Sequence, residues 1–195
     1  KHIENVRAFG LNCVVAVNRF PTDTQAELDL VRELALEAGA AKAVVSEVHA
    51  RGGEGGLELA EAVEEVANRP KHFDFLYPLE TTVQQKIETI AQKMYGADGV
   101  DFTPDALREI TWFEEHGCAY LPICMAKTHL SLSHDPKRKG RPTGFRVPVR
   151  NVHGAIGAGF LVAMCGDVIK MPGLPSTPGA CKIDIDEEGR IVGLF

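Results

Sequence analysis

The sequence predicts an α/β fold with one mostly parallel sheet of about five strands, flanked by helices. Short apolar runs rich in valine and isoleucine recur along the chain, each long enough for a strand but too short for a helix. Amphipathic segments with apolar residues at helical spacing follow the first two runs, so strands and helices alternate. Short connections between them favour parallel strands with right-handed crossovers. Continuous apolar runs are typical of strands that are covered on both faces.

The composition is that of an ordinary globular domain. Of 195 residues, 45% are hydrophobic and 25% charged, so one domain is expected over residues 1–195, with a possible internal boundary near 70–80. The net charge of −6 argues against non-specific nucleic-acid binding, and only the segment 137–141 is locally basic. The five cysteines are odd in number and scattered, which indicates free thiols. No secretory signal or membrane span is visible, so a cytoplasmic protein is expected.

The helices are predicted from apolar periodicity and from the residues that begin or end them. Glycines stop the first two, and a threonine–proline pair opens the last one. The inward face of the second helix is expected to consist of Leu28, Val31, Leu34 and Ala35. The helices predicted in this way cover residues 3–9, 25–38, 57–67, 83–95 and 104–116.

The strands are predicted from the short apolar runs. The run 145–152 contains Pro148, which cannot donate to a ladder, so this run is expected at a sheet edge or as an arm. The aromatic-rich connection 70–78 is expected to be packed, and a proline-rich loop at 171–179 leads to a small terminal pair. The predicted strands cover residues 13–17, 43–46, 121–126, 145–152 and 156–164, and the terminal pair joins 182–185 to 191–193.

Polar loops follow three of the predicted strands, at residues 18–24, 47–56 and 127–144. The carboxyl ends of parallel strands meet at one edge of a sheet, and open α/β sheets bind their ligands there. We therefore expect the three loops to converge on one site. No pair of a nucleophile and its base stands out in them, so no catalytic residue is assigned in this chain.

The first loop carries Asn18, Phe20 and Asp23. Asn18 and Asp23 suit a strand-end loop whose side chains hold the backbone, and Asn18 is also a candidate nucleotide contact. The spacing between Asn18 and Asp23 differs from that of the base-reading N-K-x-D motif of GTPases, and the lysine of that motif is absent. An aromatic residue in a polar loop either packs into the core or offers its face to a planar ligand. The local pattern leaves both alternatives open for Phe20.

The third loop carries candidate anion ligands. Its lysine and hydroxyl side chains suit an anion or a nucleotide, although helix capping and turn chemistry use the same residue types. Arg141 is a candidate for a carboxylate or a phosphate, because a guanidinium pairs with either group bidentately. A solvated surface position is the alternative for Arg141. The remaining candidates in this loop are Lys127, Thr128, Ser131 and Ser133.

A metal site is not expected in the chain. His129 and His134 lie near Asp135, but no third ligand accompanies them at convincing spacing. The cysteines contain no C-x-x-C pair. The domain is therefore expected to fold without a metal.

Seven segments of the chain carry a further, more specific signal. They lie at residues 18–24 (NRFPTDT), 52–56 (GGEGG), 95–99 (YGADG), 121–128 (LPICMAKT), 140–145 (GRPTGF), 171–175 (MPGLP) and 191–195 (IVGLF). In this order they resemble the C-terminal part of the formate–tetrahydrofolate ligases (formyltetrahydrofolate synthetases). Matches spread over essentially the whole chain are more specific than any single motif. The family's ATP-binding loop, G-x-x-x-x-G-K-[ST], is not found in these residues.

The resemblance implies a folate site in the first two loops. In these ligases an aromatic residue at the position of Phe20 stacks on the pterin, and Asp23 belongs to the same loop. A tryptophan usually faces that aromatic residue, at the position where this chain has His49. Gly52 and Gly53 would let the backbone approach the ligand closely.

The resemblance also implies the reaction. ATP phosphorylates formate, and N10 of tetrahydrofolate attacks the formyl phosphate, which requires positioning and charge stabilisation more than a covalent nucleophile. It further implies Mg²⁺ and a monovalent cation with ATP, a homo-oligomer, and contact with the rest of a ligase chain. This chain is thus expected to be a folate-side C-terminal domain that is inactive alone. The alternatives are a stand-alone, non-catalytic folate- or nucleotide-binding or assembly domain, and a piece of a P-loop nucleotide hydrolase.

Overall fold

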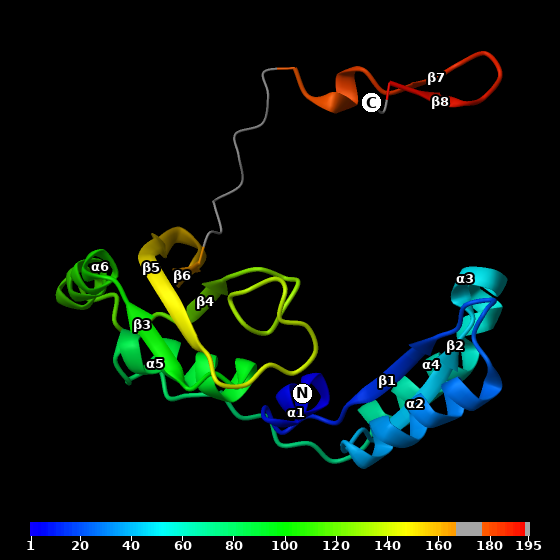
Figure 1. The fold of residues 1–195 in the computed structure, drawn as a ribbon, viewed down its shortest axis with the longest axis horizontal. Coiled ribbons are helices and arrows are strands. Elements are labelled where there is room, and N and C mark those ends of the chain that lie inside the picture. Colours follow the sequence, from blue (N-terminus) through cyan, green and yellow to red (C-terminus); the bar gives the residue numbers. More distant parts are fainter. Residues whose placement is uncertain (167–176, 194–195) are drawn as a thin grey trace.

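The strands among the described residues fall into three separate sheets. The computed structural model describes residues 1–166 and 177–193, and helices and strands alternate along most of this part (Figure 1). Three of the five pairings among the described strands are parallel, so the α/β class with mostly parallel strands is confirmed. The apolar strands that were expected in one sheet are divided between a two-stranded and a four-stranded sheet.

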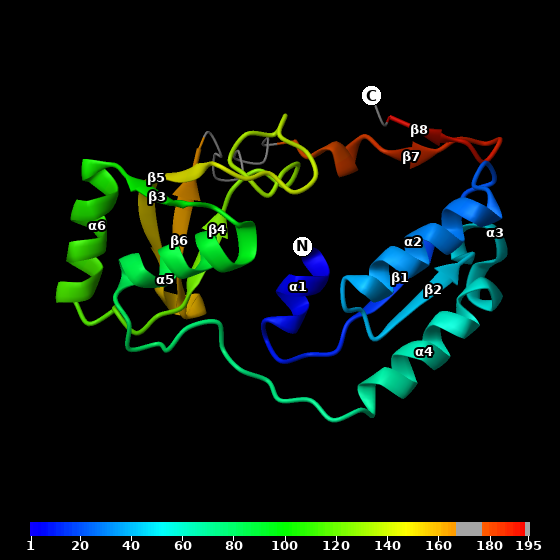
Figure 2. The ribbon, with the colours of Figure 1, turned by 60° about the horizontal axis from the view of Figure 1, so that its bottom comes forward.

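The first sheet is a parallel pair. It joins β1 (Val14–Asn18) to β2 (Lys42–Ser46), residue for residue from one end to the other. Helices α2 (Gln25–Glu37) and α4 (Leu57–Ala67) both pack on this pair (Figure 2). A short helix, α1 (His2–Arg7), precedes it and ends before Gly10, as predicted. The strand–helix–strand–helix order of this region is therefore confirmed.

Local capping signals place the helix ends correctly. Thr24 caps α2, because its side chain accepts a hydrogen bond from the Glu27 N–H and the Glu27 carboxylate returns one to the Thr24 N–H. Thr103 caps α6 (Pro104–Glu115) with its side chain alone, which accepts a hydrogen bond from the Ala106 N–H (3.2 Å), and the predicted proline stands in the first turn. Gly39 follows α2 with a φ of +97°, a conformation that ends a helix readily only with glycine.

The inward face of α2 is narrower than expected. Leu28 and Ala35 are buried, but Val31 and Leu34 are 46% and 53% exposed. The prediction that these two residues face the core is wrong. Two strands make too narrow a surface to cover the whole apolar stripe of the helix, and the buried cluster there consists mainly of alanines.

The second sheet holds the main core. Its strand order is β3-β5-β6-β4, in which β3 is parallel to β5, β4 is parallel to β6, and β5 and β6 form an antiparallel hairpin. A 3₁₀ turn, Ile156–Ala158, closes the hairpin. The four strands are β3 (Gly99–Phe102), β4 (Ile123–Ala126), β5 (Arg146–Ala155) and β6 (Phe160–Cys165).

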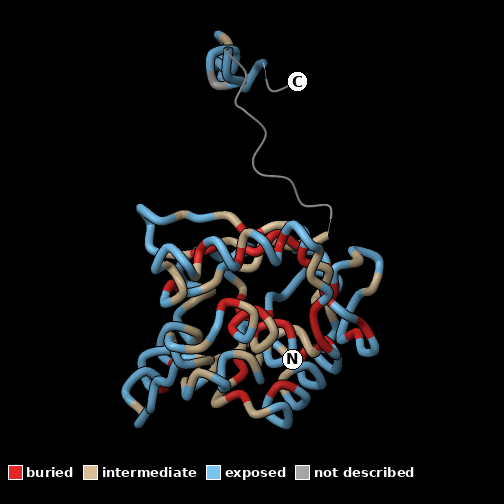
Figure 3. The backbone as a smooth tube through the Cα atoms, turned by 90° about the vertical axis from the view of Figure 1, so that its left-hand side faces the viewer, coloured by how far each residue is buried: buried red, intermediate tan, exposed pale blue. Residues whose placement is uncertain are grey.

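Helices α5 and α6 cover this sheet (Figure 2). Helix α5 (Val83–Ile90) continues as a π-helical turn, Ala91–Tyr95, so the predicted helix over 83–95 is present with a widened last turn. Buried positions, drawn red in Figure 3, recur along the helices and strands, whereas the terminal hairpin is mostly exposed. Fully buried side chains of this core include Val83, Ile87, Ile110, Val147, Val149 and Leu161.

Strand β5 corrects a prediction, because it lies in the centre of the sheet and not at an edge. Pro148 is tolerated there because the β6 partner strand ends at Cys165, which pairs with Val149. The Pro148 carbonyl oxygen still accepts a hydrogen bond from the Gly166 N–H (3.1 Å). The N–H that proline lacks would point to the same side, beyond the end of β6, so no ladder bond is lost.

Other differences have local causes. Strand β3 was not predicted, because its four residues include a glycine and an aspartate. The run 156–164 is a strand only from Phe160, and residues 48–56, expected as a loop, form the short helix α3 (Val48–Arg51) and a 3₁₀ segment, Gly52–Gly56. The connection 70–78 is packed only in part: Phe75 is 74% exposed, whereas Tyr77 is half-buried and its hydroxyl oxygen accepts a hydrogen bond from the Ile123 N–H (3.0 Å).

The terminal pair is confirmed as an antiparallel hairpin of β7 (Asp184–Ile185) and β8 (Ile191–Val192). The proline-rich loop predicted at 171–179 falls mostly outside the described residues. Within the described residues, no helix has the length and apolar character needed to cross a bilayer. All five cysteines are free, and Cys165 is buried while Cys124 and Cys181 are exposed.

Candidate functional site

Two of the three polar loops meet at the carboxyl end of the first sheet (Figure 1). Asn18 and Ser46 are the last paired residues of β1 and β2, and the Arg19 N–H donates to the Ser46 carbonyl oxygen (3.0 Å). The loop at 18–24 and the segment at 47–56 therefore leave the sheet side by side. This part of the predicted convergence is confirmed.

Phe20 is 55% exposed at this end of the sheet. The Phe20 N–H donates to Asp23 Oδ2 (2.8 Å), and the Asp23 N–H donates to the Phe20 carbonyl oxygen (3.0 Å). Asp23 thus closes a tight turn that presents the ring to solvent. The alternative in which Phe20 packs into the core is wrong, because the small core of this sheet does not include the ring.

The second wall of this end is formed by α3 and the glycines after it. His49 lies exposed on α3, between the end of β2 and the 3₁₀ segment. Gly52 has a φ of +58° and a ψ of −144°, which is strained for any residue with a Cβ. At Gly53 a Cβ would meet nothing within 4 Å, so the free chain imposes no steric need for glycine there. The sequence analysis predicted a loop over residues 47–56 and missed the short helix and the 3₁₀ segment within it.

A polar cavity of about 260 Å³ lies beside the two walls, and neither Phe20 nor His49 is among its lining residues. An ion-pair network forms part of its lining: Glu47 Oε1 accepts from Arg19 Nη1 (3.2 Å), and Glu47 Oε2 accepts from Arg51 Nη1 (2.9 Å). Carboxylate and guanidinium groups in one cavity offer both acceptors and donors to a polar heterocycle. The sequence analysis did not single these residues out. The remaining lining residues are Gln25, Leu28, Val45, Glu54, Gly55 and Glu58.

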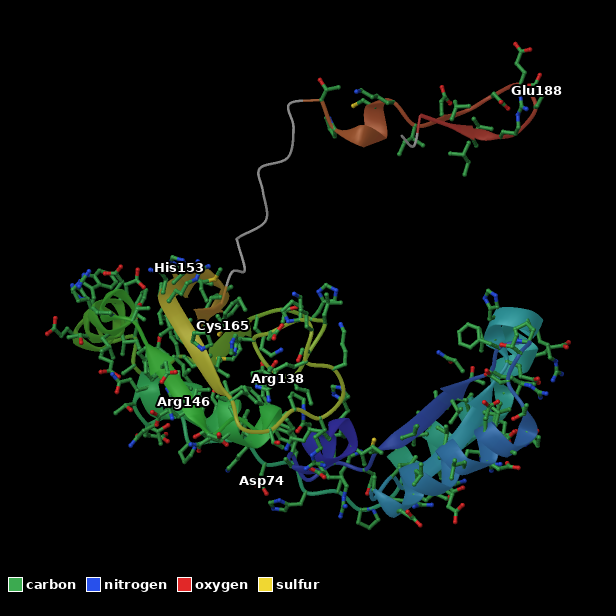
Figure 4. The ribbon with its side chains drawn as sticks, viewed as in Figure 1. Asp74, Arg138, Arg146, His153, Cys165 and Glu188 are labelled. Atoms are coloured by element: carbon green, nitrogen blue, oxygen red, sulfur yellow. The ribbon has the colours of Figure 1, made fainter. Side chains whose placement is uncertain are left out.

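The third loop does not join this site. It follows β4 in the second sheet, and Arg138, labelled in Figure 4, marks its place beside that sheet and away from α3. The predicted convergence of all three loops is therefore wrong. The cause is the division of the strands, because the carboxyl ends of β1 and β4 belong to different sheets.

The polar side chains of the third loop are engaged within the loop. Lys127 Nζ donates to the carbonyl oxygens of Thr128 (2.9 Å) and Ser131, and it lies 4.9 Å from the centroid of the Tyr95 ring. Burial lowers the pKa of Lys127. Ser131 and Ser133 are buried, and their hydroxyl groups share a hydrogen bond (2.9 Å). Turn chemistry explains these contacts, and anion binding by the loop stays a prediction.

Arg141 has a carboxylate partner in the chain itself. Its guanidinium donates to both oxygens of Glu4, at 2.6 and 2.9 Å. This hydrogen bonding holds the pKa of the Glu4 carboxyl below its usual range. A role of Arg141 toward a ligand carboxylate or phosphate would require exchange of this partner.

Two further cavities border the third loop, and sequence reasoning missed both. One is largely apolar, with a volume of about 530 Å³, and the other, of about 630 Å³, is lined by several basic side chains. They share His2, Tyr95 and Leu132. Burial raises the pKa of Tyr95 to about 12. Tyr95 belongs to the segment 95–99, one of the seven that resemble the ligase family, and this was the signal in the sequence that could have indicated the two cavities.

The described parts of the chain, 1–166 and 177–193, contain no group of three or more His, Cys, Asp or Glu side chains placed to hold a metal ion. The Mg²⁺ that the resemblance implies therefore finds no such cluster in these ranges.

Comparison with known proteins places these features in a family. The family model described as formate–tetrahydrofolate ligase matches residues 1–195. A formate–tetrahydrofolate ligase of Symbiobacterium thermophilum is 51% identical over the whole chain, and one of Saccharopolyspora erythraea is 53% identical over the whole chain. A third, of Desulforamulus reducens, is 52% identical. The chain spans 35%, 34% and 34% of the length of these three curated relatives.

Proposed function

The chain belongs to the formate–tetrahydrofolate ligase family, and we propose that it forms the folate-binding side of an ATP-dependent ligase that makes 10-formyltetrahydrofolate. In this proposal the pterin ring binds at the carboxyl end of the first sheet, between the loop that follows β1 and the segment that follows β2. The polar cavity beside these walls supplies hydrogen-bonding groups for the polar edge of the pterin.

The observation that carries the proposal is the exposed ring of Phe20. A phenylalanine that is 55% exposed on a turn closed by Asp23 contributes little to the core, whereas the face of its ring is free to stack on a planar heterocycle. His49 on α3 is the candidate for the opposite wall. An imidazole offers less flat area than the tryptophan usual in the family, but it adds a hydrogen-bonding group. Gly52 and Gly53 leave room for the ligand beside it.

The remaining chemistry is assigned to other parts of a longer ligase. The 195 residues lack a G-x-x-x-x-G-K-[ST] loop, so ATP with Mg²⁺ and a monovalent cation would bind mainly outside this chain. In the proposed reaction, formyl phosphate forms there, N10 of tetrahydrofolate, held by this chain, attacks its formyl carbon, and the C–O bond to phosphate breaks with release of inorganic phosphate. The proposed context is a cytoplasmic homo-oligomer in which residues 1–195 form a single C-terminal domain that is inactive alone.

Folate titrations of Phe20→Ala and His49→Trp test the proposal. We expect Phe20→Ala to weaken tetrahydrofolate binding by about 5- to 150-fold, or roughly 1–3 kcal/mol, through loss of the stacking face. The melting temperature should change little, because truncation of an exposed side chain has a small effect on stability. We expect His49→Trp to tighten binding, because it enlarges the opposite wall.

The matched control is Phe75→Ala, which truncates an exposed phenyl ring that lines the largely apolar cavity near the third loop and not the polar cavity at this end of the first sheet. It should leave folate affinity unchanged. Normal folate binding by Phe20→Ala, or a large drop in its melting temperature that accounts for the lost binding, would refute the stacking role.

A further inference from the structure

Glu47 connects the two walls of the proposed folate site. Its carboxylate lies between two guanidinium groups, with Oε1 at 3.2 Å from Arg19 Nη1 and Oε2 at 2.9 Å from Arg51 Nη1. Arg19 directly precedes Phe20 in the first wall. Arg51 is the last residue of α3, the helix that carries His49 in the second wall. One side chain thus joins the segments that carry both candidate stacking residues.

The backbone of Glu47 is held as firmly as its side chain. Its N–H donates to the Gly55 carbonyl oxygen (3.0 Å), and its carbonyl oxygen accepts from the Arg51 N–H (2.9 Å). A Cβ at Gly55 would lie 2.5 Å from the Glu47 backbone, so the glycine segment packs tightly against this residue. The carboxylate therefore extends from a fixed point at the end of β2.

We propose that Glu47 is a positioning residue that sets the separation of Phe20 and His49 for folate binding. This inference rests on the proposed function, because it presupposes that the two walls hold the pterin. Ordering long side chains before the ligand arrives reduces the entropy that binding must overcome. Loss of the Glu47 bridge frees the side chains of Arg19 and Arg51, and only backbone hydrogen bonds then hold the segments that carry the stacking residues.

Stability and binding should respond differently to the loss of this bridge. All three side chains are partly exposed, and ion pairs between exposed side chains contribute little to folding. The bridge should therefore affect the dissociation constant of folate more than the melting temperature.

A purely electrostatic effect would have the opposite sign. Neutralising Glu47 leaves Arg19 and Arg51 uncompensated, and tetrahydrofolate carries the carboxylates of its glutamate tail. If charge alone decided affinity, Glu47→Gln would tighten folate binding. Positioning predicts that the same substitution weakens it, so the direction of the change separates the two causes.

The test compares Glu47→Gln with Glu65→Gln in the purified protein. Glu65 on α4 bridges Lys42 and Arg69 in the same way, but Lys42 begins β2, so this bridge lies toward the other end of the sheet. We expect Glu47→Gln to weaken tetrahydrofolate binding by about 2- to 10-fold, the effect of one or two released side chains, with less than about 3 °C change in melting temperature. Glu65→Gln should leave the affinity unchanged.

The folate affinity of a double variant distinguishes a positioning role of Glu47 from a merely structural one. If Glu47 acts through the Phe20 wall, the combination of Phe20→Ala and Glu47→Gln should bind no more weakly than Phe20→Ala alone. Unchanged or tighter binding by Glu47→Gln, or fully additive effects in the double variant, would overturn the positioning role. If Phe20→Ala also binds normally, the proposed folate site itself fails, and the two failures are thereby distinguished.

Discussion

Replacement of Lys86 by methionine should destabilise the second sheet, although it removes a buried charge. Lys86 lies on α5 with no exposed surface, among the residues of the main core. Its Nζ donates to the carbonyl oxygens of Ala119 and Leu121, the latter at 3.2 Å. These two bonds tie the turn before β4 to the helix.

The magnitude follows from the groups that the substitution leaves behind. Replacing a buried ionic group by a hydrophobic one of similar volume is often neutral when every partner is replaced with it. Here the partners are backbone carbonyls, which the substitution leaves in place without a donor. Each bond from a charged donor contributes about 1.5–3 kcal/mol, and relief of the buried charge offsets part of the sum. We expect a net loss of about 2–4 kcal/mol in the free energy of unfolding.

Urea and thermal denaturation measure this loss. A change of that size in a chain of this length corresponds to a fall of about 4–16 °C in melting temperature. Lys137→Met, at an exposed position in the third loop, is the matched control and should melt like the wild type. A Lys86→Met protein that melts at or above the wild-type temperature would show that desolvation of the ammonium group outweighs its two hydrogen bonds.

The free energy of unfolding should also depend on pH through Lys86, and the direction of its pKa shift fixes the sign of this dependence. Burial lowers the pKa of Lys86 below its value in the unfolded chain, about 10.4. Between the folded and the unfolded pKa, the unfolded state binds more protons, so wild-type stability rises with pH through that window. Lys86→Met lacks this contribution, and the stability gap between the two proteins should widen as pH increases toward 10.4.

Two further predictions concern the glycines and the activity of the chain. Gly53→Ala should weaken folate binding without loss of stability, because its Cβ meets open space in the free protein. Gly55→Ala should lower the melting temperature, because its Cβ would lie 2.5 Å from the Glu47 backbone. Folate titrations and thermal melts of both variants test this pair of predictions, and the same behaviour of the two variants would contradict it. The 195-residue chain alone should form no 10-formyltetrahydrofolate from formate, ATP and tetrahydrofolate, since it lacks the phosphate-binding loop, and measurable product from the purified chain would refute this.

The sequence predicted the helices better than the strand pairings, and the reason is physical. The cap formed by Thr24 and Glu27 and the proline after Thr103 act over three or four residues, so their effect can be read locally. Pairing joins distant residues, as in the contact of Val149 with Cys165. Residues 145–152 contain no sign that β6 ends opposite Pro148. The proline therefore correctly indicated a missing donor, but it could not show that the strand is central.

The candidate site was predictable to the same extent. The side-by-side exit of the first two loops follows from parallel pairing of adjacent strands, and it was confirmed. The third loop was assigned to the same edge only because one sheet was assumed. The Arg19–Glu47–Arg51 network was missed because its members are spaced irregularly along the chain and meet only after β1 and β2 pair.

The exposure of Phe20 illustrates how sheet width decides a question that local sequence leaves open. An aromatic residue at a strand end packs inward when the neighbouring elements offer an apolar surface for it. In the part of the chain that the structure describes, the first sheet has two strands, and its helix α2 already leaves Val31 and Leu34 uncovered. A core too small for these aliphatic residues has no room for a phenyl ring, and the Asp23 turn holds that ring outward. The narrow sheet therefore explains two findings: Phe20 is available to a ligand, and the inward face of α2 buries fewer residues than predicted.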